Sequence, residues 1–151
     1  MQNGRTAERI LPAAVQANPG LITNAIEEFL RYDSSVQMSG RVTLEDIDDL
    51  GGKRIPKGES VCACWVRPTA TRRSIRTGPD RLDITRPNVR PLSFGGGIHH
   101  CLGAQLARIE AEVAIATLLR RLPDLRLDDA ENPEWRPTFV LRGLKRLPAS
   151  W

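Results

Sequence analysis

The chain has 151 residues, of which 40% are hydrophobic, 26% charged and only 5% aromatic. This composition is ordinary for a globular domain and excludes a disordered tail or a fibrous repeat. The formal net charge of +4 does not indicate a nucleic-acid-binding protein, because four arginines in one acid-free segment, residues 62–78, account for the whole excess.

The sequence lacks any apolar run of the ~18–20 residues that a membrane helix needs, and residues 1–10 lack the apolar stretch of a secretory signal. We therefore expect a cytoplasmic protein with no membrane segment, whose three cysteines stay reduced. A zinc module built from Cys62, Cys64, Cys101 and a neighbouring histidine is disfavoured. Cys-x-Cys with a distant third ligand is poor spacing for structural zinc.

Two segments near the N-terminus favour helices. Residues 6–17 favour one that Pro12 weakens. After a Pro19-Gly20 break, apolar residues recur at helical spacing from Ile22 to Tyr32, which predicts a helix with one apolar stripe.

The pattern then changes to short strand-like pieces. They span residues 36–38, 41–44 and 47–55, and the last piece folds about Gly51-Gly52. Pro56-Lys57-Gly58 indicates a second turn. We expect small β-hairpins here.

The second half is dominated by one loop and one long helix. Residues 86–100 contain proline and glycine breakers and predict an irregular loop. Residues 102–122 predict a helix that is apolar on several sides, which indicates burial against more than one neighbour. Residues 135–147 favour a hairpin turning at Gly143. The fold class is therefore mainly α with small β-sheets or hairpins.

The loop from Phe94 to Gly103 carries a single cysteine, Cys101, to the first turn of the long helix. Unpaired backbone N–H groups and the positive end of the helix dipole would stabilise a thiolate there. Glycines at 95–97 remove bulk where a large flat group could approach the sulfur. The spacing alone fits a cofactor ligand and an ordinary buried cysteine equally well.

Phe94, Gly97, Cys101 and Gly103 follow the pattern Phe-x-x-Gly-x-x-x-Cys-x-Gly, which resembles the haem-binding signature of the cytochrome P450 family. The resemblance implies that Cys101 is the thiolate ligand of the iron of haem b. It also implies that Phe94 screens the sulfur and that later backbone N–H groups temper its electron donation. No further catalytic residue is assigned in this chain.

Other positions match the family less specifically. Glu28 and Arg31 match its Glu-x-x-Arg, which in the family is a buried structural pair that locks the haem loop. Arg41 and His99 resemble residues that contact the haem propionates. The substrate-pocket strands are matched by four positions: Val36, Gln37, Val140 and Leu141.

The resemblance covers nearly the whole chain and indicates an incomplete domain, residues 1–151, corresponding to the C-terminal portion of a bacterial family member. Only 27 residues precede Glu28, so we expect the oxygen-activating helix to be missing. The implied function is oxygen insertion into a small lipophilic substrate. The alternative is a truncated, non-catalytic haem-binding remnant or pseudogene product.

The implied partners are a ferredoxin and its reductase, supplied with electrons by NAD(P)H. Arg108 resembles a basic residue on the face that receives ferredoxin. An ion pair with Glu112, four residues further along the helix, explains Arg108 equally well.

Residues 62–78 do not resemble the family, whose members usually continue Leu-Gly-Ala-Ala-Asn-Arg-Asp-Pro-Ala-Val at this point. High-GC codons for that peptide, read one base later, encode Trp-Val-Arg-Pro-Thr-Ala-Thr-Arg-Arg, which is the sequence of residues 65–73. We interpret the segment as the product of two compensating frameshifts, and we expect it to fold badly because its arginines would be costly to bury.

Overall fold

The computed structural model describes residues 14–64 and 78–151. Of the anomalous segment 62–78, which was expected to fold badly, residues 65–77 lie outside the described residues. Residues 62–64 are ordered in a β-strand, so the expectation is wrong for these three. Of the helix expected over residues 6–17, only 14–17 fall within them, and these four are helical.

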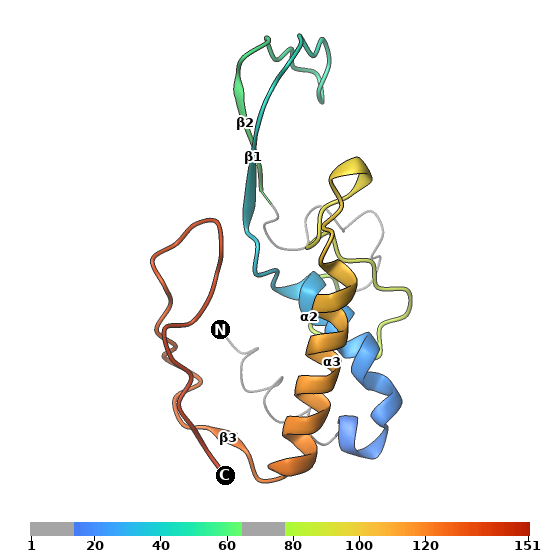
Figure 1. Ribbon diagram of the computed structural model, residues 1–151, viewed down its shortest axis with the longest axis vertical. Coiled ribbons are helices and arrows are strands. Elements are labelled where there is room, and N and C mark those ends of the chain that lie inside the picture. Colours follow the sequence, from blue (N-terminus) through green and yellow to red (C-terminus); the bar gives the residue numbers. More distant parts are fainter. Residues whose placement is uncertain (1–13, 65–77) are drawn as a thin grey trace.

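Two helices lie side by side at the centre of the molecule (Figure 1). α2 spans Ile22–Tyr32, with the bounds predicted from its apolar spacing. It follows a 3-10 turn, η1 (Pro19–Leu21), which Asn18 caps by accepting a hydrogen bond from the Gly20 N–H at 3.2 Å. α3 spans Ala104–Arg121. The small apolar core consists of Val15, Ala25, Ile26, Ile84, Ala104 and Leu119.

The expected burial of α3 on several sides is wrong for the described chain. Only Ala104 and Leu119 are buried on this helix, where it packs on α2. Leu106, Ile109 and Val113 are 57–62% exposed. The described residues contain too few elements to cover an apolar surface this wide. None of the described helices has the length and apolar character needed to cross a membrane.

An antiparallel ribbon projects from the helices (Figure 1). β1 (Met38–Val42) pairs with β2 (Ser60–Cys64) in a register that places Met38 opposite Cys64 and Gly40 opposite Cys62. The pieces predicted at 36–38 and 41–44 thus contribute to one strand.

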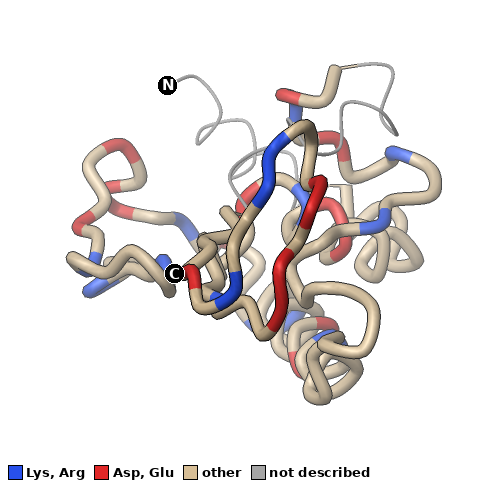
Figure 2. The backbone as a smooth tube through the Cα atoms, turned by 90° about the horizontal axis from the view of Figure 1, so that it is seen from above, with Lys and Arg blue, Asp and Glu red and all other residues tan. Residues whose placement is uncertain are grey.

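Both predicted turns of the ribbon are present. An isolated bridge joins Ile47 and Ile55 around Gly51 and Gly52, whose φ angles of 65° and 85° suit glycine. Gly58, with φ of 85°, closes the second turn by donating its N–H to the Thr43 carbonyl at 2.9 Å. Figure 2 shows basic and acidic residues interspersed along the described backbone.

The C-terminal region forms the predicted hairpin, but its turn is not at Gly143. The Arg136 N–H donates to the Gly143 carbonyl at 2.9 Å, and Trp135 bridges to Leu144, so Gly143 lies within a paired arm. The turn falls at residues 137–142, where the Thr138 hydroxyl donates to the Leu141 carbonyl. Outside the hairpin, β3 (Arg126–Leu127) pairs with β4 (Ala149–Ser150), which the sequence analysis did not predict.

Candidate functional site

The centre of the site is a carboxylate that is completely buried. Glu28 on α2 has an exposed fraction of 0%. Its two oxygens accept hydrogen bonds from Arg31, with Nε to Oε2 at 2.6 Å and Nη2 to Oε1 at 2.8 Å. Glu28 and Arg31, predicted as a structural pair, therefore form a bidentate ion pair in which both side chains are buried.

A second arginine joins this pair, and sequence reasoning missed it. Arg86, which is 8% exposed, donates from Nε to Glu28 Oε1 at 3.3 Å. The backbone N–H of Asp83 donates to the same oxygen at 2.9 Å. Since Arg86 is 58 positions from Glu28, no local spacing could indicate the contact.

The two guanidinium groups also bind the backbone of the segment that begins at residue 78. Arg31 donates to the Pro79 carbonyl at 2.8 Å and Arg86 to the Gly78 carbonyl at 2.9 Å, and both donate to the Arg81 carbonyl at 3.1 Å. This Glu–Arg–Arg cluster (Glu28, Arg31 and Arg86) thereby fixes residues 78–86 against α2.

Two further side chains, which make three hydrogen bonds, attach α2 to the chain that leads to the cysteine. Asn24 donates to the carbonyls of Ile84 and Arg86 at 2.6 and 3.0 Å. The Ser93 hydroxyl donates to the Leu30 carbonyl, at the start of the segment that carries the cysteine. Helix α2 therefore braces the base of the loop.

The cysteine loop (residues 92–103) is a sequence of tight turns. The Gly95 N–H donates to the Leu92 carbonyl at 2.8 Å, and the Cys101 N–H donates to the Phe94 carbonyl at 2.9 Å. Gly95 and Gly97 have positive φ angles of 73° and 61°, which favour glycine at both points and explain the glycine that the motif requires at 97.

Cys101 lies just before the helix and not in its first turn. A short 3-10 helix, η2 (Gly97–His99), precedes it, and Gly103 is the N-cap of α3. The Ala104 N–H donates to the Cys101 carbonyl at 3.2 Å, which holds the cysteine in the turn that leads into the helix.

The surroundings of Cys101 fit a large flat apolar group. The thiol residue is exposed, and Ile98 and Leu102 are 97% and 103% exposed. A Cβ placed on Gly96 or Gly97 would meet nothing within 4 Å, and one on Gly103 would meet only the Cys101 sulfur, at 3.9 Å. The loop thus presents the Cys101 thiol on an open, apolar surface, where the glycines add no side chains.

Arg108 of α3 contacts α2 and the loop together. It pairs with Glu27, with Nη2 to Oε2 at 3.2 Å and a second contact from Nε to Oε1, and its guanidinium lies 4.7 Å from the centre of the Phe94 ring. The hydrogen bond to Glu27 raises the pKa of Arg108 further. The alternative of a pair with Glu112 is wrong, because the carboxylate partner comes from the neighbouring helix.

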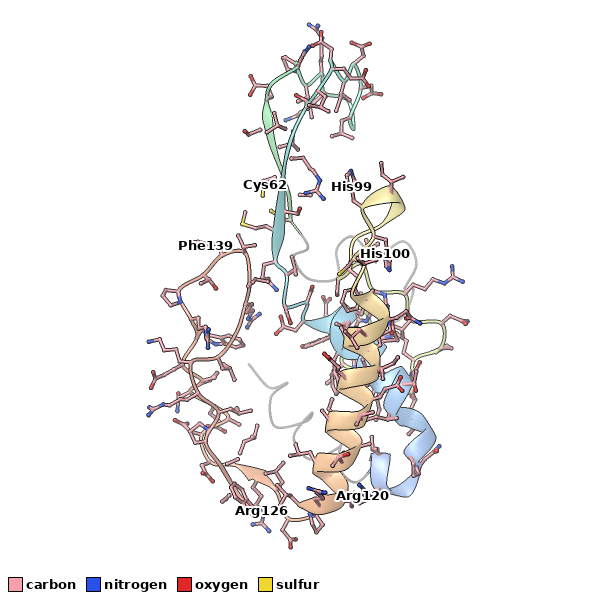
Figure 3. The ribbon with its side chains drawn as sticks, in the orientation of Figure 1. Cys62, His99, His100, Arg120, Arg126 and Phe139 are labelled. Carbon is pink, nitrogen blue, oxygen red and sulfur yellow. The ribbon has the colours of Figure 1, made fainter. Side chains whose placement is uncertain are left out.

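The two positions expected near haem propionates are both exposed. Arg41 on β1 donates to the Ser39 hydroxyl at 2.5 Å and to the Gly40 carbonyl at 2.8 Å. His99 ends η2 and lies across a gap from the β1–β2 ribbon (Figure 3). Arg41 and His99 therefore belong to different elements, the ribbon and the cysteine loop.

The four residues expected in substrate-pocket strands lie together. Val36 bridges to Leu141, and the Gln37 N–H donates to the Val140 carbonyl at 2.9 Å. Gln37 lines an open cleft of about 450 Å³ with Phe139 at the hairpin tip. Arg142 strengthens the contact between the hairpin and the end of α2, which the sequence did not indicate. It pairs with Asp33 at 2.8 Å and lies 4.0 Å from the Trp135 ring centre.

The zinc module is not formed. Cys62 and Cys64 lie on β2, whereas Cys101 lies in the loop before α3. Within residues 14–64 and 78–151, no three histidine, cysteine, aspartate or glutamate side chains lie close enough to hold a metal ion.

Comparison with known proteins shows first that the architecture is a fragment of a larger, mainly helical fold. A solved structure of P450BioI in complex with hexadec-9Z-enoic acid ligated acyl carrier protein covers 92% of this chain, with a TM-score of 0.81 and 46% identity, while the chain covers 35% of it. The solved structure of the tirandamycin C-bound P450 monooxygenase TamI covers 97% of this chain, with a TM-score of 0.85 and 37% identity. The chain covers 38% of that structure.

The sequence profile of the family described as Cytochrome P450 matches residues 17–145. The chain therefore belongs to the cytochrome P450 family, which implies a haem-thiolate cofactor. Biotin biosynthesis cytochrome P450 from Bacillus subtilis (strain 168) is 48% identical over 139 residues, or 91% of this chain and 34% of the relative. The chain spans about a third of the length of such relatives.

Proposed function

We propose that residues 1–151 are the C-terminal, haem-binding portion of a bacterial cytochrome P450 monooxygenase and that Cys101 provides the thiolate ligand of haem b. The observation that carries this proposal is the exposed thiol on an apolar, glycine-lined loop whose base the buried Glu–Arg–Arg cluster fixes to α2. Such bracing preorganises a ligand before its cofactor arrives.

The chain's own residues would have distinct roles at the bound group. Gly97 and Gly103 would leave room for the haem, and Phe94 would shield the thiolate from water. Arg41 and His99 would each contact a haem propionate. When bound, the thiolate-ligated haem supplies the activation of molecular oxygen.

Phe94 is itself held by the guanidinium of Arg108, which is fixed by Glu27. We therefore assign Arg108 a positioning role beneath the loop. Its expected part in receiving ferredoxin stays a prediction.

The proposed substrate is a small lipophilic molecule bound near Val36, Gln37, Val140 and Leu141. Support comes from the cleft beside Gln37 and from the solved relative whose acyl carrier protein bears a hexadecenoic acid. We further propose that ferredoxin and its reductase deliver electrons from NAD(P)H, and that the protein works in the cytoplasm.

A second candidate function is a haem-binding remnant without catalysis. It is favoured by the exposed apolar face of α3 and by the share of the relatives that the chain spans. The frameshift interpretation of residues 62–78 stays a proposal as well. Both the remnant and the frameshift proposals are tested by sequencing the encoding DNA and its upstream region. The three reading frames are then translated and compared.

The test of the proposed ligand is spectroscopic. The chain is reconstituted with haem, reduced and exposed to carbon monoxide, and the Soret band is recorded. We expect a thiolate-type band that disappears in Cys101→Ala and persists in the control variants Cys62→Ser and Cys64→Ser. A thiolate-type band retained by Cys101→Ala would show that another residue is the ligand.

A further inference from the structure

Three sulfur-containing side chains lie on one face of the β1–β2 ribbon. Cys62 and Cys64 are two residues apart on β2, so their side chains leave the same face of the strand. Met38 is paired directly with Cys64, and partners in an antiparallel pair also share a face. Three sulfur-bearing side chains, two thiols and one thioether, therefore occupy a single face, which we call the sulfur face.

The sulfur face is open to solvent. Cys62 and Cys64 are both exposed, and the residue opposite Cys62 is Gly40, where an added Cβ would meet nothing within 4 Å. The position facing Cys62 thus contains no side chain. A small ion can approach the sulfurs there without displacing any group.

The two thiols are neighbours on this face, because they leave the same strand two residues apart. A disulfide is disfavoured, because Cα atoms two residues apart in a strand are separated by about 6.6–6.8 Å, at the upper limit for a disulfide, and their Cβ vectors run parallel.

The ligand chemistry selects a soft cation. Thiolate and thioether sulfurs favour Cu(I), whereas carboxylate and carbonyl oxygens favour hard ions. Two thiolates and one Cu(I) leave a net negative charge. The cleft that Met38 and Cys64 line also contains the cationic side chain of Arg136, which compensates that charge.

From this juxtaposition we propose that Cys62, Cys64 and Met38 form a binding site for a soft monovalent metal ion, Cu(I). Binding forms two thiolate–copper bonds and one thioether–copper bond and releases the two thiol protons to water, with no change in oxidation state. The site is separate from the proposed haem site. Arg41 lies on the opposite face of β1, and Cys62 is on the side of the ribbon turned away from His99 (Figure 3).

The test titrates the full chain, without added haem, with Cu(I) kept reduced by ascorbate under anaerobic conditions, in competition with the coloured Cu(I) chelator bathocuproine disulfonate. We expect one Cu(I) per chain. Cys62→Ser and Cys64→Ser should each lower the affinity about 100-fold or more, beyond the 10–100-fold typical of losing an outer contact. Met38→Leu, which keeps size and apolarity, should lower it about 10-fold.

Two controls separate the sulfur face from the rest of the chain. Ala63→Ser introduces the same hydroxyl between the cysteines but on the opposite face, and Cys101→Ser removes the third thiol; both should retain the wild-type affinity. Circular dichroism checks that each variant keeps its fold.

X-ray absorption at the copper edge should show sulfur scatterers only. Nitrogen scatterers, loss of binding in Cys101→Ser, or binding retained in the double variant Cys62→Ser/Cys64→Ser would overturn the proposal. An unchanged affinity in Met38→Leu would remove Met38 from the site.

Discussion

Glu28 illustrates how much depends on a single side chain. Its carboxylate is completely buried and neutralises two buried guanidinium groups, those of Arg31 and Arg86. Breaking a buried ion pair by removing one partner is far more destabilising than breaking one at the surface, because the remaining charge cannot be solvated. The neighbouring Glu27 also pairs with an arginine, but both members of that pair keep about a fifth of their side-chain surface exposed.

We therefore expect Glu28→Gln to lower the free energy of unfolding by about 3–5 kcal/mol. Glu27→Gln, the matched control one residue earlier, should lower it by about 1 kcal/mol or less. Urea unfolding followed by circular dichroism measures both. Equal losses in the two variants would mean that the Glu–Arg–Arg cluster is not what holds residues 78–86.

Asp83 gives a dependence on pH. The pKa of this carboxyl is lowered, mainly because the Thr85 hydroxyl donates to Oδ1 at 2.6 Å. Partial burial opposes the shift, whereas the Thr85 N–H and the charges of Arg86 and Arg81 support it. Ionised Asp83 thus stabilises the fold above its unfolded pKa. The contribution is lost as the pH falls through the folded pKa.

Thr85→Val removes the hydroxyl donor and should raise the pKa of Asp83. Acid unfolding should consequently begin at a higher pH. An NMR titration of the Asp83 carboxyl reports the first effect, and ellipticity against pH the second. Thr23→Val, at an exposed position on α2, is the control and should change neither.

At the scale of elements, α3 has one face that packs on α2 and another that is exposed. Leu119 is 7% exposed, whereas its neighbour Leu118 is 44% exposed. Leu119→Ala should therefore cost about 2–5 kcal/mol of unfolding free energy, since it leaves a cavity in the small core. Leu118→Ala should cost about 1 kcal/mol or less. Urea unfolding distinguishes the two, and a larger loss in Leu118→Ala would place the core on the other side of the helix.

The elements themselves were largely predictable from sequence. Helical spacing predicted α2 from Ile22 to Tyr32. Gly51-Gly52 and Pro56-Lys57-Gly58 predicted the turns of the ribbon, because these signals depend on neighbours a few residues apart. The turn at 137–142 was misplaced at Gly143, since the Thr138 hydroxyl and not a glycine φ angle closes it.

Contacts between distant segments were the part that sequence could not supply. The partner of Glu28 at Arg86 and that of Arg108 at Glu27 depend on how α2 lies against its neighbours. The Cys101 motif was predictable as a pattern of residue types. Its openness was not, because exposure depends on what covers the loop.

At the scale of the whole molecule, the chain presents its reactive group without a cover. Cys101, Ile98 and Leu102 are exposed, so no described residue closes off the space in front of the sulfur. Monooxygenation requires a site from which water is excluded, because an open site loses reduced oxygen as peroxide or superoxide.

We therefore expect the 151-residue polypeptide, tested by itself, not to couple NAD(P)H oxidation to substrate hydroxylation. The assay supplies haem, ferredoxin, ferredoxin reductase, NAD(P)H and a panel of lipophilic substrates, and compares product formed with NAD(P)H consumed and peroxide released. Coupled product formation that Cys101→Ala abolishes would show instead that the polypeptide is a working enzyme.

The attachment of the C-terminal hairpin to the end of α2 has a consequence for synthesis on the ribosome. Val36 bridges to Leu141, and Asp33 pairs with Arg142, 109 positions later. At about 5–20 residues per second, the earlier segment waits roughly 5–20 s for its partner to be translated. During that interval the backbone groups at residues 35–37 have no partner from the hairpin, so the nascent chain exposes a strand edge that a chaperone, or another nascent copy, can occupy first.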